Sequence, residues 1–286
     1  MLVLGTYAVV QYIVAPAWDM QWLAESGMVS SMGQPEPTEF RIFGTLNATG
    51  PFAKIMMVGL LLLFDGRGLI PRLAAIPGYA SLLLTLVRAA WGGWLVGVAF
   101  IVSRLTGKLR VRLLFVLAVG VALAIPLLLY APNTERVATR AESLTNLDDD
   151  GSLNARMQLY RSTTAEALLN PVGQGIGSFG TAAKLSEGEP VSFDSGVLAI
   201  PFTLGWPGTL LYIGGLVWML LRALQIRKPE TDQFAVIAVA IVLAYMAMMV
   251  FHNQLKGLSG VTVWSFLALA LAARRYYERV PDRAQA

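Results

Sequence analysis

Arg88 has the residue type and the surroundings to bind an anion. It interrupts the apolar stretch LLLTLVRAAWGGW, in which Trp91 and Trp94 follow it closely. A guanidinium at such a depth costs several kcal/mol unless it faces a polar cavity. Arg88 therefore marks either an anion site in the mouth of a helical bundle or an arginine that reaches the membrane surface beside interfacial tryptophans.

A second arginine, Arg156, lies in a predicted amphipathic helix. The segment SLNARMQLYRSTTAEALLN opens with Ser152, a residue type that caps helices, and is followed by the helix-ending Pro171. Helical spacing places Arg156 one turn before Tyr160, so both can face the same interior, whereas Arg161 points elsewhere. The planar, always-charged fork of an arginine suits a phosphate group.

A glycine-rich stretch, NPVGQGIGSFG (170–180), follows that helix. Its second half has the spacing of a dinucleotide-binding loop, but such a loop works only between a strand and a helix. Because a helix precedes it here, the stretch predicts a tight turn that uses the freedom of glycine at positive φ.

Composition assigns these residues to a membrane protein. Hydrophobic residues make up 56% and charged residues 14% of the 286 residues, far from the balance of a soluble domain. The absence of cysteine excludes disulfides and thiolate metal sites, and a formal charge of +4 is too small and dispersed to indicate nucleic-acid binding.

The elements that must position the arginines are membrane helices. Apolar runs of the length that crosses a ~30 Å hydrocarbon core predict an all-α fold: one integral membrane domain, residues 1–286, with about eight spans. A long outer loop, residues 131–195, contains the amphipathic helix. The spans fall near 2–17, 51–64, 70–87, 89–103, 113–130, 196–221, 232–250 and 260–273.

The charges between the spans predict an orientation. If the loop 131–195 lies outside the cytoplasm, the inner side holds thirteen basic and five acidic residues and the outer side nine basic and thirteen acidic residues. Cytoplasmic loops carry an excess of Lys and Arg. This predicts that the loop 131–195 is extracytoplasmic.

Four segments, in this order, resemble the O-antigen ligase and O-antigen polymerase superfamily of bacterial membrane glycosyltransferases. They are RIFGTLNATGPFA (41–53), LLLTLVRAAW (82–91), SLNARMQLYRSTTAEALLNPVGQGIGSFG (152–180) and DSGVLAIPFTLGWPGTLL (194–211). The resemblance runs from about residue 41 to 221. It implies a GT-C-like bundle in the bacterial inner membrane that acts on the outer face.

The resemblance also implies an activity. Such enzymes take a glycan from undecaprenyl diphosphate and transfer it, with inversion and without a metal or other cofactor, to a sugar hydroxyl. By this comparison Arg88 and Arg156 bind the diphosphate. The further substrate-binding residues, which lie in the matching segments, are Arg41, Tyr160, Gly175 and Gly177.

The general base is predicted to be Asp194, which stands where many relatives, the ligases particularly, carry histidine. A carboxylate can accept the proton of the attacking hydroxyl, but an aspartate before a membrane helix is also a routine N-cap. The single histidine, His252, is followed by Asn253 at another outer helix end and is the alternative base.

These features favour a polysaccharide polymerase that extends O-antigen, capsule or exopolysaccharide, with chain-length regulators and export proteins as partners in the lipid bilayer. A ligase that moves glycan to another acceptor is the alternative in the same class. From a different class, a transporter would need paired intramembrane charges or helix-breaking motifs in matching halves, and this sequence has neither. A purely structural membrane subunit would not need Arg88 in an apolar helix.

Overall fold

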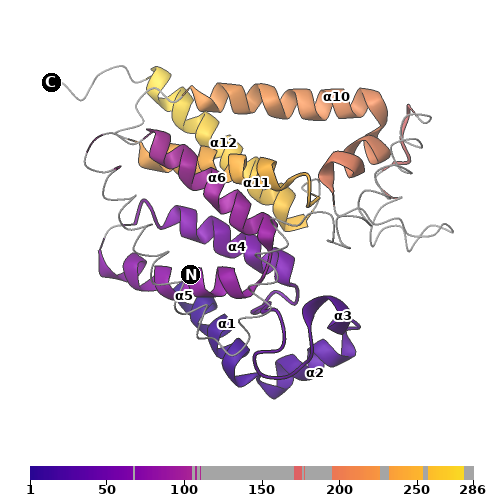
Figure 1. Ribbon diagram of the computed structural model, residues 1–286. Helices are drawn as coiled ribbons and strands as arrows, with labels where there is room; N and C mark the ends of the chain where they lie inside the picture. The colour runs from indigo at the N-terminus through magenta and orange to yellow at the C-terminus, as the bar shows by residue number, and fades with distance from the viewer. Residues whose placement is uncertain are drawn as a thin grey trace. The chain divides into compact units, whose positions relative to one another are not determined.

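The structure, a computed structural model, is all-α in the part of the chain that it describes (Figure 1). The predicted helical class is therefore confirmed. The predicted span 113–130 and most of the outer loop, with its amphipathic helix, lie outside the described residues. Those residues are 1–66, 68–104, 107, 110, 171–175, 177, 195–225, 232–253 and 257–279.

The chain forms two compact units. The first unit comprises residues 1–142 and 229–244, and the second comprises residues 143–228 and 245–286. The prediction of one membrane domain stays a prediction.

The helices of the first unit pack through small residues. A Cβ on Gly5 of α1 would lie 2.9 Å from the backbone of Pro77 in α5, and a Cβ on Gly97 of α6 would lie 2.8 Å from the Leu61 side chain. Small residues let membrane helices approach closely. The helices are α1 (Leu2–Val14), α2 (Ala17–Glu25), α3 (Val29–Met32), α4 (Thr49–Leu62), α5 (Leu69–Leu84), α6 (Arg88–Arg104) and most of α11 (Gln233–Met248).

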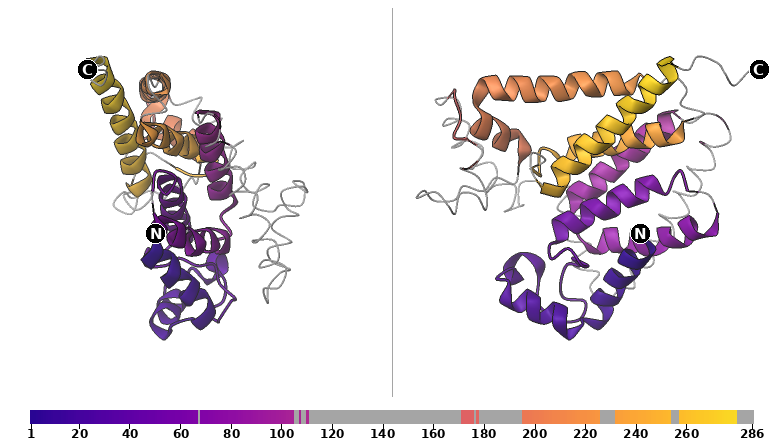
Figure 2. Two further views of the ribbon diagram at one scale, coloured as in Figure 1. Left: turned by 90° about the vertical axis from the view of Figure 1, so that its left-hand side faces the viewer. Right: turned by 180° about the vertical axis from the view of Figure 1, so that it is seen from behind.

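The second unit is built on α10 (Gly196–Leu224) and α12 (Gly257–Arg279). The ring of Tyr212 meets that of Trp264 edge to face at 5.7 Å, and ten residues further along each helix Arg274 donates to the Arg222 carbonyl. The two helices therefore run in the same direction. Figure 2 shows α10 bending sharply near its start, where Gly205 has φ 63° and ψ −174°.

Seven of the eight predicted spans coincide with a helix. Gly196–Leu224 and Gly257–Tyr276 are long and apolar enough to cross a membrane, and α1, α4, α5 and α11 are shorter apolar helices. The first span ends earlier than predicted, because Ala15 adopts φ 47° and Pro16 turns the chain into α2. The eight-span arrangement stays a prediction.

Candidate functional site

Arg88 is positioned by a break between α5 and α6. Helix α5 ends at Leu84, Leu86 adopts φ 54°, and α6 begins at Arg88. The Val87 carbonyl accepts from the Ala90 N–H at 2.9 Å and so starts the new helix. Arg88 therefore begins a helix rather than interrupting an apolar one, and it is only half-buried. It also lies at the helix end that carries a partial positive charge.

Side chains satisfy the carbonyl groups that the break leaves without helical donors. The Leu82 carbonyl accepts from Thr85 Oγ1 at 2.6 Å and from Trp91 Nε1 at 3.0 Å. Arg41 Nε donates to the Thr85 carbonyl at 2.9 Å, and its Nη2 donates to the Leu86 carbonyl at 3.4 Å. Unpaired carbonyls are costly in apolar surroundings, so these bonds allow the break to exist there.

Arg41 is placed as a support for the turn that carries Arg88. Its Nη1 donates to the Ser31 carbonyl at 3.3 Å, and its backbone N–H donates to the Met32 carbonyl at 2.6 Å. All three guanidinium nitrogens thus bind carbonyl groups. The predicted contact of Arg41 with substrate stays a prediction.

Gln11 fixes the segment that follows Arg41. Its side chain is 0% exposed. Oε1 accepts from the N–H groups of Phe43 (3.3 Å) and Gly44 (2.9 Å). Nε2 donates to Asp19 Oδ2 at 2.7 Å and to the Gly44 carbonyl at 3.2 Å, so every hydrogen-bonding position of the amide is used. Gln11 was not among the residues predicted from the sequence, although a glutamine within the apolar run LVLGTYAVVQYIV is a signal for such a role.

Lys54 is a second residue that was not among the predicted site residues. It lies half-buried in the second turn of α4, which starts soon after the segment held by Gln11. A lysine inside a predicted apolar span is a signal for a functional site, because such charges are expensive in a membrane. The first unit therefore contains three basic residues, Arg41, Lys54 and Arg88, that lie in or beside its predicted spans.

In the second unit, the glycine-rich segment supplies a hydrogen bond that α10 lacks. Pro207 has no N–H, so the Thr203 carbonyl loses its helical donor. The Gly175 N–H donates to that carbonyl at 3.0 Å. Two further bonds run between the segments: Gln174 N–H to the Phe202 carbonyl at 2.8 Å, and Trp206 N–H to the Pro171 carbonyl at 2.9 Å.

Glycine is required where these two segments touch. Gly173 has φ 78°, and a Cβ there would lie 2.9 Å from backbone atoms of Thr203 and Leu204 and closer still to Gly205 N. The positive φ that the sequence predicts is found at Gly173 and Gly175. At Gly175 and at Gly177, a Cβ would meet no atom of the described residues within 4 Å. The glycine with the close contact, Gly173, was not among the predicted site residues.

The alternative base, His252, lies beside the start of α10. The Gly196 N–H donates to the Met249 carbonyl at 2.9 Å, and a Cβ on Gly196 would lie 3.1 Å from the His252 carbonyl oxygen. His252 is half-buried. The other predicted site residues, Arg156, Tyr160 and Asp194, lie outside the described residues, but Asp194 is two positions before Gly196 in the sequence.

Comparison with known proteins gives one result. A family model described as O-antigen ligase matches residues 73–213. This range contains Arg88, the segment 171–175 and the break in α10. No curated protein and no solved structure matches the chain.

Proposed function

Because the chain belongs to the O-antigen ligase and O-antigen polymerase superfamily, we propose that it polymerises lipid-linked oligosaccharide repeat units into a surface polysaccharide. The donor is a glycan on undecaprenyl diphosphate, and the product is O-antigen, capsule or exopolysaccharide. The observation that carries this proposal is the family match over residues 73–213, which includes the helix break at Arg88.

In this mechanism a sugar hydroxyl attacks the anomeric carbon of the donor as the bond to the diphosphate breaks, and the configuration inverts without a metal. Arg88 and Arg156 bind the diphosphate and stabilise the negative charge that develops on it. Arg88 suits this task because the start of α6 adds N–H groups and a favourable helix dipole. Tyr160, Gly175 and Gly177 are the further proposed substrate contacts.

The proton of the attacking hydroxyl is accepted by Asp194. His252 is the second candidate for this role, because its backbone lies beside the first residue of α10, two positions after Asp194. A positioned base contributes typically about 10²–10⁴-fold.

A deletion strain complemented with variants tests the activity and the base together. We expect deletion to remove long polysaccharide chains while single repeat units remain attached; loss of all attached glycan would instead indicate a ligase. The N-cap position of α10 is Ser195 rather than Asp194. Asp194→Asn keeps the size and polarity of the side chain but removes the base, so it should lower polymerisation at least about tenfold without changing yield or melting temperature. Normal polymer from Asp194→Asn but not from His252→Gln would assign the base to His252.

The chain is a membrane protein, and we propose that the loop 131–195 lies outside the bacterial inner membrane. Two contacts support this arrangement, because each joins groups that are predicted to lie on the same side of the membrane. Arg41 donates to the carbonyl groups of residues 85 and 86 on the predicted outer side. Arg274 donates to the Arg222 carbonyl on the predicted inner side.

Single cysteines test this orientation in a chain that has none. Cysteines at Ser143 and Ser186 should react with a membrane-impermeant thiol reagent added to intact cells, and a cysteine at Thr106 should react only after permeabilisation. The opposite labelling pattern would reject the orientation.

A further inference from the structure

The C-terminal half of α12 has a hollow on its surface that the proposed transfer reaction does not use. Its volume is about 540 Å³, within the size range of small-molecule sites. Because steps of three and four residues return to one helix face, most of the lining lies on a single face of α12. The lining residues are Ala268, Leu271, Ala272, Arg275, Tyr276 and Arg279.

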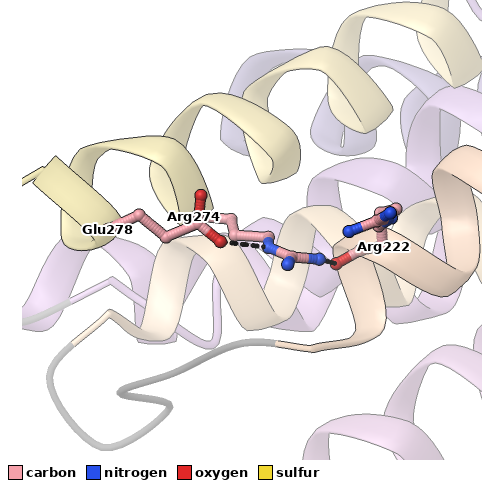
Figure 3. A network of polar contacts seen from close by, with 3 residues as sticks. All are labelled: Arg222, Arg274 and Glu278. Atoms are coloured by element: carbon pink, nitrogen blue, oxygen red, sulfur yellow. Dashed lines mark hydrogen bonds and ion pairs between the residues drawn. The ribbon is translucent and has the colours of Figure 1, made fainter.

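A neighbouring arginine is already engaged (Figure 3). Arg274 Nε pairs with Glu278 Oε1 at 2.9 Å, and Arg274 Nη1 donates to the Arg222 carbonyl at 2.7 Å. The Arg222 guanidinium in turn lies over the Trp218 ring at 5.4 Å. Glu278 is the single acidic residue in the sequence of α12. Because Glu278 pairs with Arg274, α12 has no other carboxylate that could pair with Arg275 or Arg279.

Two positive charges therefore line the hollow. Arg275 and Arg279 are exposed, one turn apart, and neither forms an ion pair within the described ranges of the chain. Like charges four residues apart destabilise a helix. An anion bound between the two guanidinium groups would relieve that repulsion and accept hydrogen bonds from both.

The other half of the hollow is apolar. The span that is long enough to cross a membrane, Gly257–Tyr276, ends within it, so Leu271 lies toward the hydrocarbon and the two arginines lie at the level of lipid headgroups. The small side chains of Ala268 and Ala272 leave room for an acyl chain.

We propose that this hollow binds an anionic phospholipid, with the phosphate between Arg275 and Arg279 and an acyl chain along Leu271. An anionic headgroup fits better than a zwitterionic one, because the ammonium of the latter would face two guanidinium groups. A free phosphate would leave the apolar half unused. This inference does not rest on the proposed transferase activity.

The test is a lipid titration of the purified full-length protein in detergent, read as melting temperature. Phosphatidylglycerol should raise the melting temperature, whereas phosphatidylcholine and inorganic phosphate should not. Arg275→Gln and Arg279→Gln should each increase the amount of phosphatidylglycerol needed for half of the shift by about fivefold, the effect of one basic residue near an anionic lipid. The matched control is Arg72→Gln, which removes an exposed arginine from α5 and should leave the titration unchanged.

Three results would overturn the proposal: equal shifts with phosphatidylcholine, the same shift with inorganic phosphate, or an unchanged titration in both variants. If either glutamine variant is unstable without lipid, Arg275→Lys and Arg279→Lys keep the charge and should retain most of the phosphatidylglycerol response. Loss of that response in the lysine variants while Arg72→Lys retains it would mean that bidentate phosphate binding is essential. The same loss in Arg72→Lys would reject the site.

Discussion

Arg88→Ala is expected to lower polymer formation by about 10²–10³-fold, because removing one donor that stabilises developing negative charge typically costs this much. The protein should still fold. Arg88 is half-buried at the first position of α6, and the break before it is held by other side chains, those of Thr85, Trp91 and Arg41. The measurement is the chain-length distribution of surface polysaccharide, together with the yield of detergent-extracted protein.

Two variants make this result specific. Arg88→Lys retains the charge but loses the bidentate fork, so it should restore little polymer. Arg104→Ala removes an arginine from the last turn of the same helix, where the guanidinium lies over the Phe100 ring at 5.1 Å, and it should leave polymerisation intact. Wild-type polymer from Arg88→Ala at normal yield would remove Arg88 from the diphosphate site.

Local signals in the sequence predicted the helical class and most helix positions. Long apolar runs specify membrane helices without reference to the rest of the fold, which is why α10 and α12 appear close to the predicted 196–221 and 260–273. The family resemblance was likewise predicted from four short sequence segments. The match of residues 73–213 to a family model described as O-antigen ligase confirms it.

The break that positions Arg88 depends on distant residues. The apolar run LLLTLVRAAW does not by itself indicate where one helix ends and the next begins. The carbonyl groups of Thr85 and Leu86, which have no helical donor at this break, accept hydrogen bonds from Arg41, more than forty residues earlier in the chain. The amide of Gln11 then fixes the chain at Gly44. No local pattern in the sequence indicates which of these groups meet.

In the glycine-rich segment, too, the local structure was predicted from the sequence but the contact with a distant segment was not. Its composition predicted a tight turn, and its spacing drew attention to Gly175 and Gly177. The close contact instead belongs to Gly173, whose partner, Gly205, is the non-helical residue of α10, two positions before Pro207. A pattern within one segment cannot specify which of its glycines faces another segment.

Gly173→Ala is therefore expected to detach the segment 171–175 from α10 and to abolish polymer formation. A methyl group at this position would overlap backbone atoms that cannot move aside as a side chain can, and the positive φ adds roughly 1–2 kcal/mol of strain. Three backbone hydrogen bonds between the segments would be lost, each worth about 1 kcal/mol net. We expect a clearly lower melting temperature as well as loss of polymer.

Gly177→Ala is the matched control, because a Cβ there meets no atom within 4 Å in the part of the chain that the structure describes. Its melting temperature should equal that of the wild type, and its activity separates two roles for the glycine pattern. Loss of polymer at normal stability would mean that the backbone at Gly177 approaches the substrate closely, as the family resemblance implies. Normal polymer would leave Gly173 as the glycine that this segment needs, with a structural role at the break in α10.

A Gly173→Ala protein with wild-type stability and polymer would show that the contact with Gly205 is not required, and the proposed link between this segment and catalysis would then fail.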